Sequence, residues 1–189
     1  MDVEVTKKMF TVDEYHRMGE AGILGPEDRV ELIEGEILQM SPIGNRHAAC
    51  VNRANKLLIT RLQDRGLVSI QNPVRLDMYS EPQPDVLVLK PRDDFYASTG
   101  HTAADVLLMI EVSDTTLRYD TKVKLPIYAR SDVPEVWIEN LQEDLLLVCR
   151  DPAGRSYRTQ LTLRLGEFIS PPGFPELSFK VEDLLGRPA

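Results

Sequence analysis

Two short runs of the sequence, PDVLVLK over 84–90 and VLLMIEV over 106–112, are almost continuously apolar. Runs of this length without polar alternation are typical of strands that are covered on both faces of a sheet. A chain that carries them must also supply helices for both faces of that sheet. The two runs therefore predict an α/β fold with a buried central sheet.

The rest of the chain supplies further strands and the helices that such a sheet needs. A helix is predicted over 47–65, which Gly66 follows, and another over about 120–130. Further strands are predicted over 67–76, 135–140, 144–149 and 156–165, with turn residues at 151–154. Because strands and helices are interleaved, we expect a mixed central sheet that is flanked by helices.

Both ends of the chain carry additional elements. Thr11 is placed as the cap of a short helix that ends near Gly22, and RVELIEGEILQM over 29–40 alternates in the manner of a β-hairpin with its turn at Gly35. The segment 179–185, which Gly186 follows, predicts a closing helix. A length of 189 residues without repeats or flexible linkers favours a single domain over 1–189.

Composition limits where this chain can act and how it can bind. Its net charge of −8 argues against coating nucleic acid through a global field, although a local site stays possible. Cys50 and Cys149 lack the spacing of a zinc or redox site, so we expect two reduced core thiols. No apolar run approaches the ~18 residues that a membrane span requires. We therefore expect a cytoplasmic protein with no membrane partner.

Two acids stand out because they belong to the apolar runs. Asp85 begins the first run, and Glu111 interrupts the second. An ionised carboxylate in a buried strand is costly unless it is paired or binds a metal. Each acid alone is explained nearly as well by a loop cap or an arginine partner. Two such acids at consecutive strand ends favour a divalent cation, which relieves their mutual repulsion.

A carboxylate-held Mg²⁺, for which Mn²⁺ can substitute, suits the hydrolysis of a phosphodiester. This reaction needs an anionic transition state neutralised and a nucleophile made from water, and the metal does both. A nearby ammonium would add the remaining positive charge. The pair Pro84-Asp85 followed by Glu111-Val112-Ser113 resembles the PD-(D/E)xK nuclease signature, with Ser113 where that signature has lysine.

The longer pattern resembles the Uma-two family of endonucleases within the restriction-endonuclease-like superfamily. The shared motifs are ELIEGE (31–36), SPIGNRHA (41–48), QPDVLVL (83–89), IEVSDTT (110–116), YDTKVKLPIYA (119–129) and VPEVWI (133–138). Six motifs in order are far more specific than any one of them. The resemblance implies a restriction-endonuclease-like core and a homodimer, since related nucleases often pair to cut two strands.

The resemblance also implies roles for particular residues. Asp85 and Glu111 would be the metal ligands, and Lys124 would be the active-site lysine, displaced from the strand to the following helix. Asp120 and Tyr128 lie one helical turn either side of Lys124, on its face. Lys122 is the reserve candidate, because Pro126 leaves the start of that helix and the direction of Lys124 open.

Two further residues enter the predicted site with open alternatives. His47 projects to the same side of its helix as apolar residues, so it is either a satisfied core histidine or a group that orients water or ligates near the metal. Glu36 follows the hairpin glycine and is either an outer carboxylate of the site or an exposed hairpin acid. The basic residues Arg46, Arg53 and Lys56 share another face of the His47 helix, where solvent explains them more readily than phosphate contacts.

The predicted function is a metal-dependent endonuclease that cleaves DNA. A nuclease-fold interaction or dimerisation protein that has lost catalysis is the alternative, favoured by the acidic composition and the absence of a recognisable DNA-reading motif. The set of Asp85, Glu111 and Lys124 favours the enzyme. A metal-dependent hydrolase of another substrate would share the same site.

Overall fold

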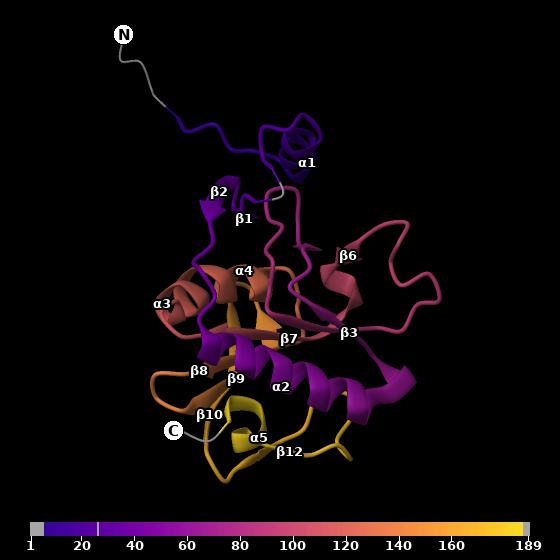
Figure 1. Ribbon diagram of the computed structural model, residues 1–189, viewed down its shortest axis with the longest axis vertical. Coiled ribbons are helices and arrows are strands. Elements are labelled where there is room, and N and C mark those ends of the chain that lie inside the picture. Colours follow the sequence, from indigo (N-terminus) through magenta and orange to yellow (C-terminus); the bar gives the residue numbers. More distant parts are fainter. Residues whose placement is uncertain (1–5, 26, 187–189) are drawn as a thin grey trace.

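The computed structural model describes residues 6–25 and 27–186, and its main feature is a six-stranded sheet between two helical layers (Figure 1). The strands lie in the order β10-β9-β8-β7-β5-β3. Their bounds are Leu67–Ile70 (β3), Val86–Leu89 (β5), Val106–Ser113 (β7), Glu135–Asn140 (β8), Leu145–Ala153 (β9) and Ser156–Arg164 (β10). The two apolar runs form adjacent inner strands, β5 and β7, which confirms the α/β fold with a buried sheet.

Strand direction explains why a helical segment lies over the centre of the sheet. Strands β7 and β8 are parallel neighbours, whereas the other neighbouring pairs are antiparallel, so the sheet is mixed as predicted. Parallel neighbours need a connection that crosses one face of the sheet. Here this connection is a continuous helical segment made of α3 (Leu117–Tyr119), η3 (Asp120–Lys124) and α4 (Leu125–Arg130).

Alternating side chains of the inner strands face two helical layers. One face packs against α2 (Asn45–Leu62) and α5 (Val181–Leu185), and the other packs against the crossover helices (Figure 1). Because strand side chains alternate, Ile110 and Val112 point towards α2 whereas Met109 points towards α4. Glu111 therefore lies on the face that the crossover covers.

The N-terminal elements sit at the upper end of the molecule in Figure 1. Helix α1 (Val12–Glu20) begins after Thr11, which forms a capping box with Glu14, so the predicted cap is confirmed. Strands β1 (Val30–Ile33) and β2 (Glu36–Gln39) form the predicted hairpin, whose turn is Glu34-Gly35. The hairpin is tied to the rest of the chain at Leu32, whose carbonyl accepts a 2.8 Å hydrogen bond from the amide of Glu81.

Several boundaries differ from the prediction for local reasons. The strand expected over 67–76 ends at Ile70, because Gln71 has a left-handed φ of 50° that breaks the ladder. Strand β9 continues to Ala153, so the turn lies at Gly154-Arg155 rather than over 151–154. The long helix begins at Asn45, and a 3₁₀ turn η1 (Gln63–Arg65) closes it. The remaining short elements are β4 (Val74–Arg75), β6 (His101–Thr102), η2 (Ala103–Asp105), β11 (Phe168–Ile169) and β12 (Phe179–Lys180), which takes the first two residues of the expected C-terminal helix.

The crossover helix tolerates an internal proline because one of its turns is widened. The amide of Leu125 donates to the carbonyl of Asp120, five residues back, which is a π-helical step. Pro126 then stands in the first turn of α4, where it needs no amide donor. The helical segment begins at Leu117, before the predicted start at about 120, and Lys124 lies in its π-helical turn.

One carboxyl group inside the sheet has no partner. Glu139, on β8, is fully buried against the α2 face, and neither of its oxygens has a hydrogen-bond partner in the described part of the chain. Burial raises the pKa of Glu139 to about 8, and the charge of Asp85 adds to this effect. The folded protein therefore holds a proton at Glu139 in a pH range in which the unfolded chain has lost it.

The pKa of Glu139 predicts that stability falls as the pH rises from about 5 to about 8. Each such group contributes up to ~1.4 kcal/mol per pH unit, and Glu139→Gln removes the contribution of this one. Urea unfolding across this pH range should show a shallower slope for Glu139→Gln than for wild type. The exposed Glu143→Gln is the matched control, and equal slopes for wild type and Glu139→Gln would show that Glu139 does not hold this proton.

Candidate active site

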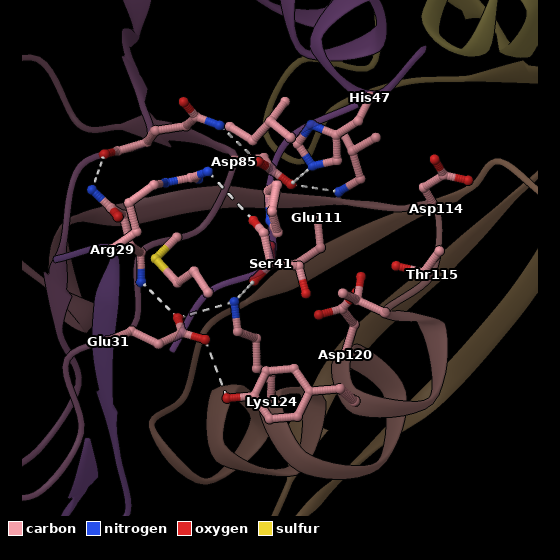
Figure 2. Close-up of a pocket in the computed structure, with 18 of the residues that line it drawn as sticks. Arg29, Glu31, Ser41, His47, Asp85, Glu111, Asp114, Thr115, Asp120 and Lys124 are labelled. Atoms are coloured by element: carbon pink, nitrogen blue, oxygen red, sulfur yellow. Dashed lines mark hydrogen bonds and ion pairs between the residues drawn. The ribbon is translucent and has the colours of Figure 1, made fainter. Parts of the chain in front are cut away.

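A pocket of about 580 Å³ opens where the hairpin, the start of α2, the ends of two strands and the crossover helix meet. Figure 2 shows the side chains of Asp85, Glu111, Asp120 and Lys124 gathered around one hollow, each from a different part of the chain apart from the two on η3. The pocket lies at the carboxyl end of β7, next to the start of β5. Ends of strands are common places for ligand sites in α/β sheets.

Sheet topology brings the two predicted metal ligands together. Asp85 immediately precedes β5, which runs antiparallel to β7, so the start of one strand lies beside the end of the other. The amide of Val112 donates to Oδ2 of Asp85 at 2.9 Å, which fixes this carboxylate next to Glu111. The predicted placement of Asp85 and Glu111 at adjacent strand ends is therefore what the structure shows.

Glu111 is almost completely buried, at 3% exposure, and its carboxylate is met by the crossover helix. Oε1 accepts a hydrogen bond from Nζ of Lys124 at 3.2 Å and another from the hydroxyl of Tyr128. Burial, together with the charges of Asp120 and Asp85, raises the pKa of Glu111 to about 8 against the opposite effect of Lys124. A second positive charge beside Glu111 would favour its ionised form.

Lys124 is buried between two carboxylates. Its Nζ lies 3.2 Å from Oε1 of Glu111 and 3.1 Å from Oε2 of Glu31. Burial alone would lower the pKa of Lys124, but the charges of Glu111, Glu31 and Asp120 outweigh burial and raise it. Lys124 is thus held as a cation inside the pocket, close to both predicted metal ligands.

Glu31 is itself fixed by neighbours from other segments. Oε1 accepts a hydrogen bond from the hydroxyl of Tyr119 at 3.1 Å, and Oε2 accepts one from the amide of Gln83 at 3.1 Å. These contacts leave Glu31 4% exposed. The hairpin thereby supplies a rigid acceptor that holds Lys124 from the side opposite the sheet.

Ser113 occupies the position at which the superfamily signature has lysine, and it faces the crossover helix. Its hydroxyl donates to Oδ2 of Asp120 at 2.6 Å, and Thr116 donates to the same oxygen at 2.7 Å. Because Glu111 and Ser113 share one face of β7, position 113 points towards the helix that carries Lys124. A side chain can therefore reach this part of the pocket either from position 113 on β7 or from position 124 on the crossover helix.

His47 lies in the pocket and contacts Asp85 directly. Its Nε2 is 3.0 Å from Oδ2 of Asp85, whose other oxygen accepts a 3.2 Å hydrogen bond from the side chain of Gln71. Nδ1 of His47 is buried, and no described residue bonds to it. Of the two placements predicted for His47, the geometry shows the one beside the site and not the one inside the apolar core.

Glu36 does not reach the pocket. It pairs with Ile33 beside the hairpin turn, and its carboxylate forms an exposed 2.7 Å ion pair with Lys7. The outer-carboxylate position expected of Glu36 is therefore corrected, since Glu31, nearer the open end of the hairpin, is the hairpin acid that lines the pocket. Lys122, the reserve lysine, is exposed and lines a different hollow near β10.

Two of the three basic residues singled out on α2 have structural partners, and the third, Lys56, is exposed. Arg46 donates to the carbonyl of Leu141 and pairs with Asp144, and Arg53 donates to the carbonyl of Leu185. Arg29 differs from Arg46 and Arg53 because it lines the pocket. Its guanidinium donates to the carbonyl of Ser41 at 3.4 Å. Among the arginines that the structure describes, Arg29 is the one that lines this pocket.

The donor set suits a hydrated Mg²⁺ ion. In the described ranges no three carboxylate, imidazole or thiol groups stand ready as a complete ligand set. Mg²⁺ typically keeps several waters and binds one or two protein carboxylates, so it does not need such a set. Asp85 and Glu111 provide two carboxylates, and the burial that raises the pKa of Glu111 is the kind of cost that a bound cation offsets.

Comparison with known proteins connects this pocket with a family. The model of the Uma2 family, described as "Putative restriction endonuclease", matches residues 12–182, which is most of the chain. The chain belongs to the Uma2 family. The matched range includes every residue of the pocket discussed above, so the resemblance seen in the sequence motifs is confirmed.

One solved structure shares the fold of this chain. It is described as a putative nuclease belonging to DUF820 from Anabaena variabilis ATCC 29413, and it aligns with a TM-score of 0.71 over 93% of this chain and 97% of its own. Its sequence is 17% identical, so the similarity shows a shared fold. No curated protein matches the chain. In the ranges that the structure describes, no helix has the length and apolar character needed to span a membrane.

Sequence reasoning on this Uma2 chain missed Glu31. A signal was present, because Glu31 stands among Val30, Leu32 and Ile33 as Glu111 stands in its apolar run. The sequence alone favours Glu36, the third acid of ELIEGE, because it follows the turn glycine. Asp120 and Tyr128, which were expected on the face of Lys124, do lie beside it and beside Glu111 respectively.

The buried position of Lys124 generates a stability prediction. Lys124→Met should destabilise the protein by about 3–5 kcal/mol, because it leaves the carboxylates of Glu31 and Glu111 buried without their shared cation. Lys122→Met, a change of the same type at an exposed position, should alter stability by less than about 0.5 kcal/mol. Urea unfolding at pH 8 measures both, and similar losses for the two variants would contradict the ion-pair geometry.

Proposed function

We propose that this Uma2 protein is a Mg²⁺-dependent endonuclease that hydrolyses DNA phosphodiester bonds, with Mn²⁺ as a substitute ion. Asp85 and Glu111 hold the metal, and Lys124 supplies the active-site ammonium from the crossover helix. The observation that carries this proposal is the buried contact of Lys124 with Glu111, 3.2 Å long, directly beside Asp85. A homodimer and a cytoplasmic location accompany the proposal as expectations from the family resemblance and the sequence.

The chemistry divides between the metal and the protein's own groups. A bound Mg²⁺ ion would neutralise charge on the reacting phosphate and make water a better nucleophile at neutral pH. Asp85 is oriented for binding by three hydrogen bonds, from Val112, His47 and Gln71. A carboxylate fixed in this way needs little reorganisation when a ligand arrives.

Lys124 would stabilise the negative charge of the transition state. When Glu111 turns to a metal ion, Glu31 keeps Lys124 in place, because Oε2 of Glu31 holds Nζ at 3.1 Å independently. A preorganised cation in a site that excludes water acts more strongly than the same cation in solvent. Losing one such group typically costs about 10²–10³ in rate.

His47 acts as a positioning residue in this proposal. Its Nε2 lies 3.0 Å from Oδ2 of Asp85, so the ring orients that carboxylate. Carboxylates that ligate metals are usually oriented by hydrogen bonds of this kind. Arg29, at the pocket mouth, would contact a phosphate next to the one being cleaved.

Removing either proposed ligand should abolish cleavage. Asp85→Ala and Glu111→Ala are expected to lose Mg²⁺-dependent cleavage of a mixture of single-stranded, double-stranded and branched DNA while circular dichroism stays native. Glu36→Ala is the matched control, because its carboxylate lies outside the pocket and its loss should leave the rate unchanged. Undiminished cleavage by either ligand variant would refute the assignment. If wild type cuts no DNA with any divalent ion, the non-catalytic interaction protein becomes the better account.

The displaced lysine can be tested by moving it back to the strand. Lys124→Met should reduce single-turnover cleavage by about 10²–10³ with little change in metal affinity, and Lys122→Met should cleave normally. Adding Ser113→Lys to Lys124→Met should restore part of the rate, since position 113 faces the same helix. Assays at low temperature, with folding verified, separate rate from stability. Full activity of Lys124→Met would show that this lysine has no role in the reaction.

A further inference from the structure

A second hollow, of about 860 Å³, lies next to the proposed active site. The two hollows share one wall, because Ile70 and Asn72 line the second while Gln71, between them, lines the first. The second hollow is bounded by the edge strand β3 and by the segment 95–101, which belongs to the loop that protrudes beside β6 in Figure 1.

Phe95 stands at the rim of this second hollow in an unusual conformation. It is 70% exposed, and its φ of 49° lies in the left-handed region, as does the φ of 64° of the next residue, Tyr96. Left-handed backbone costs a non-glycine residue about 1–2 kcal/mol. Such strain persists only where the surroundings impose it, and it is concentrated at functional sites.

The surroundings of Phe95 do impose its conformation. Arg92 binds Asp94 through two hydrogen bonds of 2.6 Å and also donates to Ser98 and Thr99 at 3.0 Å. Tyr96 is buried, and its hydroxyl donates to the carbonyl of Lys90 at 2.7 Å. The backbone of the loop is therefore held on both sides of Phe95, whose ring is exposed.

We propose that the second hollow binds an unstacked base of single-stranded DNA, with the ring of Phe95 as the stacking platform. This proposal rests on the nuclease function proposed above and names its substrate class. One strand would run from the pocket that contains Asp85, across Gln71, to the hollow beside Phe95. Exposed aromatic rings beside a strand-binding groove are the usual means of holding single strands without reading their sequence.

The active site itself favours a flexible single strand over a duplex. Glu111 and Lys124 are 3% and 5% exposed, so a phosphate must enter a recess to meet them. A single strand can bend a phosphate into such a recess, whereas a duplex is stiff and keeps its bases stacked away from Phe95. The net charge of −8 also disfavours the broad phosphate contacts by which proteins hold a duplex.

The lining of the second hollow suits a base and its backbone better than an apolar protein segment. Arg75 and Asn72 line it and keep N–H donors for base edges and phosphates besides those that bond to Asp13 and Ser69. His16 and His101 also line it, and each has one ring nitrogen bonded to a protein group, Glu81 and the carbonyl of Pro73 respectively. Tyr96 and His101 meet edge to face with ring centres 5.2 Å apart, which adds a second aromatic surface near Phe95. Aromatic surface combined with polar donors is typical of single-strand recognition.

A substitution at Phe95 gives a direct optical test of stacking. The chain has one tryptophan, Trp137, which is fully buried, so Phe95→Trp introduces a single exposed reporter. Oligothymidylate added in the presence of Ca²⁺ should quench this fluorescence, while duplex DNA of the same length should not. Phe168→Trp, at an exposed position on β11, is the matched control and should show no quenching by either DNA.

Affinity measurements complete the test. Phe95→Ala should weaken binding of labelled oligothymidylate by roughly five-fold to one-hundred-fold, which corresponds to the loss of one stacked base, and Phe95→Trp should restore it. Phe168→Ala should bind as wild type does. Wild type that fails to bind single strands, unchanged binding by Phe95→Ala, or self-association that depends on Phe95 would each overturn the proposal.

Parallel cleavage assays in Mg²⁺ separate this proposal from the function on which it rests. If Phe95→Ala cleaves single strands and duplexes at wild-type rates, the substrate class is wrong and the nuclease assignment stands. If wild type cleaves nothing although oligothymidylate quenches Phe95→Trp, the hollow binds single strands and the nuclease assignment fails. The supporting result is a rise in KM for single strands in Phe95→Ala with kcat little changed.

Discussion

The buried ammonium of Lys124 is the interaction on which the other features of the pocket depend. It contacts Glu31 from the hairpin and Glu111 from the central sheet, so it joins three segments that are far apart in sequence. A buried cation must be matched by nearby anions, and each of these anions would be costly without it. The hairpin, the sheet and the crossover helix are therefore held in the arrangement that forms the pocket.

The same constraint explains the form of the crossover. Because β7 and β8 are parallel neighbours, the segment between them must pass over Glu111, and its π-helical turn points Lys124 at the carboxylate. The lysine can then be absent from the strand, where Ser113 stands instead. Burial makes the pocket selective as well, since only a group able to enter the recess meets both the cation and the proposed metal ligands.

The sequence predicted those parts of the pocket that correspond to a local pattern of residues. Acids inside apolar runs identified Asp85 and Glu111, and the crossover that follows from two parallel strands was implied by the helix after β7. The apolar neighbours of Glu31 mark it as a buried acid, but its approach to Lys124 depends on docking of the hairpin at Leu32 against a distant segment, which no local pattern shows. The left-handed conformation of Phe95 was not predictable from the sequence either, because contacts across the loop impose it.

The proposed function depends on Asp85 and Glu111 together holding a divalent metal ion beside Lys124. Anomalous diffraction from crystals soaked in Mn²⁺ tests it most directly, because the signal locates the ion without any assumption about substrate. We expect one strong peak at coordination distance from an oxygen of Asp85 and an oxygen of Glu111, with Lys124 still bound to Glu31. A peak elsewhere, or no peak between these carboxylates at saturating Mn²⁺, would contradict it.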